Sequence, residues 1–350
     1  MPLKFNPVYK ITNSILKKLI EIEKIKEDVK SFPLNPKVLA GLRKTSKINT
    51  IHYSTRIEGN SLTIKEVKQV LNGKSFPARK RDEQEVKGYF RALDMVKKLI
   101  KKTAITEQDI KILHGLVIGD NKSTDYRQGQ NSIIDSSTGY IVYMPPEAKD
   151  VAPLMTSFVN WINENKNVIP APILAAIVHY QFVTIHPYYD GNGRTARILT
   201  TLLLHQCGYG LKGIYNLEEY YADNLQDYYK GLTVGKSHNY YEGRAQADIT
   251  DWIDFFVSGM LKSFESVKKH FIKQKNEKDK SEFIKNLDSR QKQVLPLFEE
   301  SNFITTKDLE KLFNFSSRAS RQLAQKWVKI GFLLIVDNSK KNRKYKLNFE

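Results

Sequence analysis

The densest group of chemically active side chains in this sequence lies between His186 and Arg197. It holds an imidazole, the carboxylate of Asp190, a Gly-Asn-Gly loop and two arginines, Arg194 and Arg197. An apolar helical pattern follows, so the loop leads into a helix N-terminus, where free backbone N–H groups and the helix dipole favour an anion. The sequence therefore predicts a phosphate-binding site with a base beside it.

Each residue type in this stretch suits one part of phosphoryl or nucleotidyl transfer. The imidazole of His186 can act as a general base toward an attacking hydroxyl. Asp190 can hold Mg²⁺ together with substrate phosphates, and the N–H groups of residues 191–193 can surround phosphate oxygens. Arg194 and Arg197 can neutralise the distal phosphates. The alternative is a turn before a buried helix, but so many polar groups on one turn favour function.

The surrounding pattern predicts mostly helices. One helix is expected over 46–58, ending before Gly59, a suitable left-handed residue after a helix. Capping boxes at Thr63 and Thr106 predict two more helix starts. Residues 130–144 read as a β-hairpin, and an apolar helix over 171–184 runs into the histidine. The expected fold is mainly α with one hairpin.

The C-terminal part is expected to be a separate small domain. Helix signals occur at about 288–300, 306–313 and 317–330, and two short strands follow around a basic tip at 337–342. Three helices and a basic hairpin are the order of a winged helix-turn-helix. Residues 281–350 hold 14 Lys and Arg against 8 Asp and Glu. DNA contact and protein interaction both remain open for this domain.

Composition sets further limits. The net charge of +18 is spread along exposed helix faces and does not by itself establish nucleic-acid binding. The single cysteine, Cys207, excludes a disulfide framework and a cysteine-based zinc site. No apolar run is long enough to span a bilayer and no signal core precedes the chain. We expect a soluble cytoplasmic protein without a membrane partner, and a homodimer is left open.

The stretch from His186 to Arg197 resembles the motif of the Fic (filamentation induced by cAMP) family, His-Pro-Phe-x-Asp/Glu-Gly-Asn-Gly-Arg-x-x-Arg. The one departure is Tyr188 at the phenylalanine. The resemblance covers about 46–260. It implies a Fic-type helical bundle with one β-hairpin flap, and transfer of AMP from ATP, with Mg²⁺, to a Ser, Thr or Tyr hydroxyl of a protein, including self-modification. Phosphotransfer and AMP removal are alternative chemistries at the same site.

By this resemblance His186 is the catalytic base and Asp190 the metal ligand. The flap that docks the target segment as an added strand falls at Ser132, Ile133 and Ile134. The tyrosine pair lines the adenine pocket, with core packing an equal alternative for one of the two. The residues assigned to nucleotide binding are Asp190, Gly191, Asn192, Gly193, Arg194, Thr195, Ala196, Arg197, Tyr228 and Tyr229.

A second motif, Ser54 to Gly59, resembles the inhibitory pattern of the same family, Ser/Thr-x-x-x-Glu-Gly/Asn. Ser54 and Glu58 are four residues apart and share one helix face. The resemblance implies that Glu58 pairs with Arg197 and keeps this arginine from the γ-phosphate. Because both motifs lie in one chain, inhibition would be intramolecular.

These expectations divide the chain into four parts. Residues 1–45 form an N-terminal helical region, and 46–262 form the Fic catalytic domain with its inhibitory helix at 46–58. A linker is expected over 263–284. The winged helix-turn-helix domain then occupies 285–350.

Overall fold

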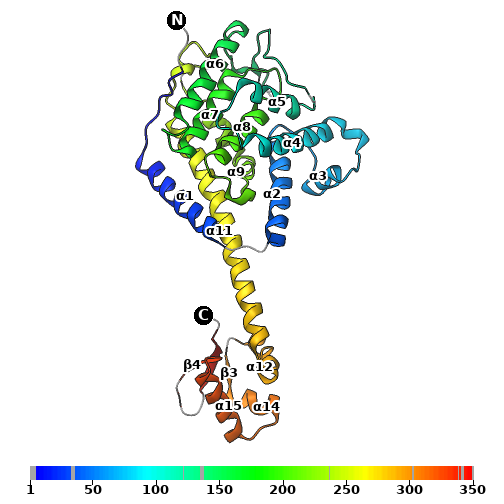
Figure 1. The fold of residues 1–350 in the computed structure, drawn as a ribbon, viewed down its shortest axis with the longest axis vertical. Helices are drawn as coiled ribbons and strands as arrows, with labels where there is room; N and C mark the ends of the chain where they lie inside the picture. The colour runs from blue at the N-terminus through cyan, green and yellow to red at the C-terminus, as the bar shows by residue number, and fades with distance from the viewer. Residues whose placement is uncertain are drawn as a thin grey trace. The chain divides into compact units, whose positions relative to one another are not determined.

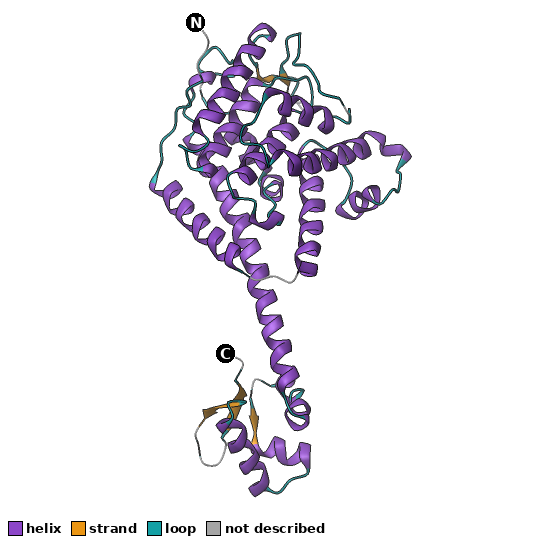
Figure 2. Cartoon of the chain, in the orientation of Figure 1, coloured by secondary structure: helices purple, strands orange, loops and turns teal. Residues whose placement is uncertain are grey.

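The computed structural model describes residues 5–32, 36–120, 122–134, 138–235, 237–301, 303–337, 339 and 343–348. The chain divides into two compact units, Met1–His270 and Phe271–Glu350. Both units are mainly helical, with short strands (Figure 2). No helix in the described part of the chain is long and apolar enough to cross a membrane.

The helices of the first unit follow one another along the chain with short connections (Figure 1). They are α1 (Asn13–Ser31), α2 (Pro36–Ile57), α3 (Ile64–Leu71), α4 (Lys80–Leu99), α5 (Glu107–Val117), α6 (Ala148–Asn165), α7 (Ala171–Ile185), α8 (Asn192–Gln206), α9 (Glu218–Asp223), α10 (Leu225–Leu232) and α11 (Thr250–Asn286). Short 3₁₀ turns lie at η1 (Pro77–Arg79), η2 (Leu211–Gly213) and η3 (Arg244–Gln246).

Helix α7 is the centre of the first unit. Every residue of α7 except Val183 is buried, because its sequence is apolar on all sides, which is typical of a helix enclosed by others. Helix α8 packs beside α7 (Figure 1) and buries most of its own side chains. The loop between these two core helices is therefore held at both ends.

The predicted inhibitory helix is part of the longer helix α2, which begins at Pro36 and ends at Ile57. Proline is well tolerated at the first position of a helix, so the break expected in this region falls before Pro36. Gly59 has φ +91°, as predicted for the left-handed residue after the helix. Both predicted capping boxes, at Thr63 and Thr106, are present at the starts of α3 and α5.

The predicted hairpin is present as strands β1 (Ile133–Ile134) and β2 (Ile141–Tyr143), which pair antiparallel. The strands are shorter than the expected segments because the register shifts between Ile133 and Ile134. Residues 135–137, at the predicted turn, lie outside the described residues. Among the described residues of the first unit this is the one named sheet.

Residues 263–284, expected as a linker, are helical and continue α11 to Asn286. This segment contains neither proline nor glycine, and its lysines and glutamates have high helix propensity. Its polarity suggested a linker, but a polar composition is equally compatible with a solvent-exposed helix.

The second unit has the predicted order of helices and strands. It contains α12 (Ser289–Val294), α13 (Leu297–Glu300), β3 (Ile304–Thr305), α14 (Thr306–Phe313), α15 (Ser317–Lys329), β4 (Leu333–Asp337) and β5 (Lys344–Leu347). The helix expected at 288–300 is interrupted before Pro296, whose ring is disfavoured inside a helix.

The strands of the second unit form an antiparallel sheet in the order β3-β5-β4. Trp327, Leu309, Leu333 and Tyr345 belong to its buried core. Of the predicted basic tip, Asn338 and residues 340–342 lie outside the described residues.

Candidate active site

The candidate base, His186, lies directly after α7 with left-handed backbone angles, φ 51° and ψ 59°. Its N–H donates to the carbonyl of Phe182 at 3.0 Å. Its ring Nδ1 lies 3.3 Å from the carbonyl oxygen of Val183. Since a carbonyl oxygen can only accept, Nδ1 carries the hydrogen and Nε2 keeps a lone pair. The ring is therefore oriented with Nε2 available as a proton acceptor.

Burial lowers the pKa of His186 to about 4, because a low-dielectric surrounding disfavours the charged imidazolium. The nearby guanidinium of Arg127 acts in the same direction, whereas the carbonyl of Val183 opposes it. At neutral pH the imidazole is uncharged, which is the form that a general base needs.

A pH profile tests this environment. A base works only while it is unprotonated, so the rate falls as the pH drops through the pKa of His186. Because this pKa is about 4, we expect a labelling rate governed by this group to hold from pH 7.5 down to about pH 5.5. Single-turnover AMP incorporation at saturating ATP would measure it. A loss with an apparent pKa of about 6.5, the value of a solvated histidine, would contradict the expectation.

The loop after His186 is closed by the side chain of Asn192. Its Oδ1 accepts the N–H of Tyr188 at 3.0 Å, and its Nδ2 donates to the carbonyl of Tyr188 at 2.7 Å. The buried Tyr188 ring stacks on His114, with ring centroids 3.4 Å apart. His114 Nε2 in turn donates to the carbonyl of Asp190 at 2.9 Å. The aromatic group at position 188 therefore packs the loop, and Asn192 acts through its side chain as well as its backbone.

Helix α8 begins after Gly191, which has φ +77°. Among the described residues, no hydrogen-bond partner is present for the backbone N–H groups of Asn192, Gly193 and Arg194. These are the first N–H groups of the helix, which have no carbonyl within it to bind. Together with the helix dipole they form an anion-binding site, as the sequence predicted.

Asp190 stands at the edge of this site with its carboxylate 66% exposed. Its Oδ1 accepts from the N–H of Gly191 at 2.6 Å and from Nη2 of Arg194 at 3.2 Å. No partner is present for Oδ2 among the described residues. No group of three or more His, Cys, Asp or Glu in this part of the chain could form a metal cage. A single open carboxylate oxygen fits a magnesium ion whose other ligands are phosphates and water.

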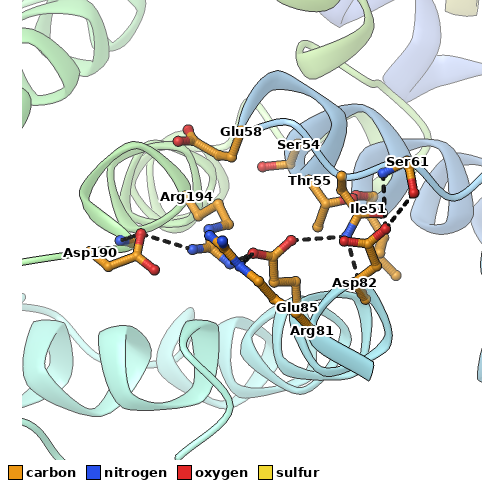
Figure 3. A network of polar contacts seen from close by, with 12 residues as sticks. Ile51, Ser54, Thr55, Glu58, Ser61, Arg81, Asp82, Glu85, Asp190 and Arg194 are labelled. Atoms are coloured by element: carbon orange, nitrogen blue, oxygen red, sulfur yellow. Dashed lines mark hydrogen bonds and ion pairs between the residues drawn. The ribbon is translucent and has the colours of Figure 1, made fainter. Parts of the chain in front are cut away.

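Arg194 is buried in a polar network that joins α8 to α4 and the end of the inhibitory motif. Figure 3 shows it between Asp190 and Glu85, and its Nη1 lies 3.3 Å from Glu85 Oε1. Glu85 Oε2 accepts from Nδ2 of Asn60 at 2.9 Å. The sequence analysis did not identify Glu85 or Asn60. The position of Asn60 directly after Glu58 and Gly59 was the one available signal.

All three guanidinium nitrogens of Arg197 are occupied. Nε donates to Ser54 Oγ and Nη2 to the carbonyl of Ser54, both at 2.8 Å. Nη2 also lies 2.8 Å from Glu58 Oε1, which is the contact that the family resemblance implied. A Cβ added to Gly193 would collide with Glu58 Oε1. The Glu58 carboxylate therefore lies against the first turn of α8.

Two further residues of the predicted set point elsewhere. Thr195 and Ala196 are completely buried, so their side chains pack inside the first unit. Their part in the candidate site is to fix the first turn of α8.

The two tyrosines have different surroundings. Tyr228 is 1% exposed, and its hydroxyl accepts from Arg197 Nη1 at 3.3 Å and lies 3.0 Å from His179 Nε2. Tyr229 is 46% exposed and donates its hydroxyl to the carbonyl of Ile57 at 3.1 Å. Tyr228 thus supports Arg197 within the core, which leaves Tyr229 as the tyrosine of the pair that a nucleotide could reach.

Replacing Tyr228 with phenylalanine should lower the free energy of unfolding by about 1–3 kcal/mol, because buried polar groups of Arg197 and His179 lose a partner. Tyr229→Phe is the matched control and should change it by less than about 0.5 kcal/mol, since its hydroxyl is partly exposed. Urea unfolding measures both. Equal effects of the two substitutions would contradict the different placement.

The predicted flap is anchored to the catalytic loop by Arg127. This buried arginine donates to the carbonyl of His186 at 2.9 Å, to that of Gly129 at 3.0 Å, and to that of Pro146. The three carbonyls belong to the catalytic loop and to the segments before β1 and after β2. Arg127 was noted in the sequence as a landmark near the hairpin, but its positioning role becomes visible only in the structure.

Ser132 and Ile133 are half-buried on the flap, whereas Ile134 is 54% exposed. Tyr189, in the catalytic loop, accepts the N–H of Gly129 at 2.7 Å through its hydroxyl. Tyr143 of β2 donates to the carbonyl of Thr184 in α7 at 2.6 Å. The hairpin is therefore tied to the loop and to α7 and presents an apolar side chain to solvent.

Comparison with known proteins adds a family match. Residues 104–204 match the model of the Fic/DOC family. The chain is 30% identical over 204 residues to protein adenylyltransferase Fic of Drosophila virilis, covering 55% of this chain and 40% of that protein. It is 33% identical over 178 residues to the protein of the same name from Drosophila melanogaster, covering 48% and 34% respectively. The chain thus spans less than half the length of these curated relatives.

The fold is similar to those of solved structures. A Fic family protein from Desulfovibrio desulfuricans G20 aligns over 98% of each chain with a TM-score of 0.62 and 23% identity. Fic-1 from C. elegans aligns over 75% of this chain and 73% of its own, with a TM-score of 0.59 and 23% identity. At this identity the likeness establishes the helical fold.

Proposed function

We propose that this chain, which carries a Fic domain, is a protein adenylyltransferase that moves AMP from ATP to a hydroxyl group of a protein. The observation that carries the proposal is the convergence of three features on one loop. These are the lone pair of His186 Nε2, the free N–H groups at the start of α8, and the flap tied to the loop through Arg127. The curated relatives are named for the same activity.

In the proposed reaction the hydroxyl oxygen of the target attacks the α-phosphorus of ATP. His186 Nε2 takes the hydroxyl proton, the bond between the α-phosphorus and its bridging oxygen breaks, and pyrophosphate leaves with that electron pair. The N–H groups at residues 192–194 bind phosphate oxygens, and Arg194 adds a fixed positive charge. A magnesium ion held by Asp190 would neutralise phosphate charge.

The flap would hold the target segment. A short strand with a free edge can accept an extended peptide through main-chain hydrogen bonds. Exposed Ile134 then contacts the incoming chain. Docking of this kind depends mainly on the backbone, so the target's sequence is not specified by the flap.

The same proposal includes autoinhibition by Glu58. Its carboxylate pairs with Arg197 and lies against Gly193, so it competes with phosphate for the arginine and for the first turn of α8. Two anions cannot share this site without strong repulsion. ATP would then bind with its distal phosphates misplaced.

The identity of the transferred group is tested with two labelled forms of ATP. With the Glu58→Gly protein and a cell lysate, we expect label at the α-phosphate to appear on protein and label at the γ-phosphate to stay in solution. A protein mass increase equal to AMP would confirm the assignment. Transfer of the γ-label would instead indicate phosphotransfer. Loss of label on later addition of wild-type protein would reveal AMP removal.

A second candidate function, DNA binding, is favoured by helix α15 of the second unit. Arg318, Gln322, Gln325 and Lys329 are exposed at a spacing that places them on one helix face, and α15 contains no acidic residue. Arginine, lysine and glutamine are the side chains that read base edges and phosphates.

For this candidate, a gel shift of the full chain on duplex DNA should weaken by at least about tenfold between 50 and 200 mM salt. Arg318→Glu should reduce DNA binding, and the matched Lys311→Glu on exposed α14 should reduce it less. Equal effects, or no shift, would leave protein interaction as the function of this unit.

A further inference from the structure

The first unit contains a second cavity of about 640 Å³ that the proposed reaction does not use. It lies between α2, α4, α8 and the segment around η2. Neither His186 nor Asp190 lines it. A cavity of this volume is within the range of sites that hold small molecules.

The cavity lies on the same helix faces as the inhibitory contact. Ser46 and Thr50 of α2 line it, and Ser54 and Glu58 follow at further steps of four residues, so all four share one face. Helix α8 repeats this spacing. Its Thr201 and His205 line the cavity, and Arg197 and Gly193 precede them at steps of four.

Direct contacts join the two sites. Thr201 donates its hydroxyl to the carbonyl of Arg197 at 3.0 Å. Thr201 and Glu218 line the cavity and also a small space beside Arg197. One pair of helices therefore forms the inhibitory contact at one end and walls of the cavity at the other.

The charges around the cavity favour an anion. Arg43, Lys47, Lys97 and Lys212 line it, whereas Glu218 is its one carboxyl group among the described residues. Burial raises the pKa of Glu218 to about 7, so this carboxyl offsets little of the positive charge at neutral pH. Lys47 and Lys97 also pair with Asp94, each at 2.8 Å, which leaves a net positive rim.

The wall between the cations is apolar. Leu93, Val96 and Ile100 present α4 to the cavity. On the opposite segment, Leu211 and Lys212 have positive φ angles of 40° and 56°. Strained backbone of this kind is frequent at ligand sites. An apolar wall with a cationic rim suits an organic anion better than a bare inorganic ion.

We propose that this cavity is a regulatory site for a small organic anion, a phosphate or carboxylate on an apolar body, which binds the inhibited state more tightly. The direction follows from the walls. Ser46, Lys47 and Thr50 complete the cavity only while α2 lies against α8, and this is also the state in which Glu58 contacts Arg197. A ligand that needs both helices stabilises that state. The regulatory half of this inference rests on the proposed function, whereas the binding half does not.

Binding is tested with phenyl phosphate, followed by NMR shifts of cavity methyl groups such as those of Leu93 and Thr201. We expect Arg43→Glu/Lys97→Glu to weaken binding by at least about tenfold, because two rim charges are reversed. Lys44→Glu/Lys98→Glu makes the same charge change at neighbouring exposed positions outside the cavity and should leave the affinity unchanged. Phenol and inorganic phosphate should each bind more weakly than phenyl phosphate.

Shifts confined to the first turn of α8 would overturn the site, as would equal losses in the two double variants. Because both variants keep the catalytic loop intact, binding there cannot imitate the expected difference. No transfer activity is needed for this readout, so failure of the proposed function would not affect it.

Coupling is tested by measuring the same affinity in Glu58→Gly. Since coupling between two sites is reciprocal, loss of the Glu58–Arg197 contact should weaken phenyl phosphate binding by about fivefold or more. Equal affinity in wild type and Glu58→Gly would overturn the regulatory role while leaving the site itself in place. Tighter binding in Glu58→Gly would reverse the proposed direction.

Discussion

Glu58→Gly should raise the initial rate of AMP incorporation by at least about tenfold. A hydrogen bond between charged groups contributes about 1.5–3 kcal/mol, which corresponds to a change of about ten- to a hundredfold in an equilibrium. Removing the carboxylate frees Nη2 of Arg197, which now contacts Glu58 at 2.8 Å, and opens the space against Gly193. Self-labelling with α-labelled ATP measures the rate.

Two further variants make this result specific. Glu58→Gln keeps the shape of the side chain but removes its charge, so it should give an intermediate rate. Glu27→Gly removes an exposed glutamate near the end of α1 and should leave the rate at the wild-type level. If Glu58→Gly and wild type label at the same rate, the contact is structural and inhibition by this residue is wrong.

His186→Ala in the Glu58→Gly background should reduce AMP incorporation by about 10²–10⁴-fold, the contribution typical of a general base. The affinity for ATP should stay within about threefold, because the anion site at the start of α8 does not use the imidazole. Single-turnover labelling gives the rate and a titration of ATP gives the affinity.

His270→Ala is the matched control, since this histidine is exposed on α11 and remote in sequence from the loop. It should label like the parent. Comparable losses in rate and in ATP affinity for His186→Ala would indicate a binding role instead of proton transfer. Retention of full activity would exclude His186 as the base.

Arg127 links the two halves of the proposed reaction. Its guanidinium holds the carbonyl of His186 and two carbonyls beside the flap strands. A shift of the flap would therefore act on the loop that carries the base. This arrangement places target docking and proton transfer in one hydrogen-bonded unit, although the residues concerned come from separate segments.

Much of the candidate site was accessible before the fold. The catalytic motif is contiguous, so its loop and helix start follow from local rules on glycine and on helix N-termini. Both capping boxes and the hairpin were predicted for the same reason. The linker prediction at 263–284 differed from the observed helix because composition alone does not distinguish a polar helix from an irregular segment.

Contacts between distant segments were a different matter. The partners of Arg194 include Glu85, which in the sequence looks like any helix-surface glutamate. The adenine assignment for Tyr228 also followed from spacing, and its hydroxyl is instead buried between Arg197 and His179. Such partners depend on which helix faces meet, and a helical pattern gives the buried face without naming its neighbour.

The stretch from His186 to Arg197 determined by itself that this protein has a base, a carboxylate and an anion-binding helix start in one loop, because those groups are adjacent in the chain. The tertiary structure alone decided how Arg197 is held. Ser54 and Tyr228 reach it from positions 143 and 31 residues away, and α2 and α8 extend that contact into a cavity. Packing of helix faces brings these groups together, and no local spacing encodes it.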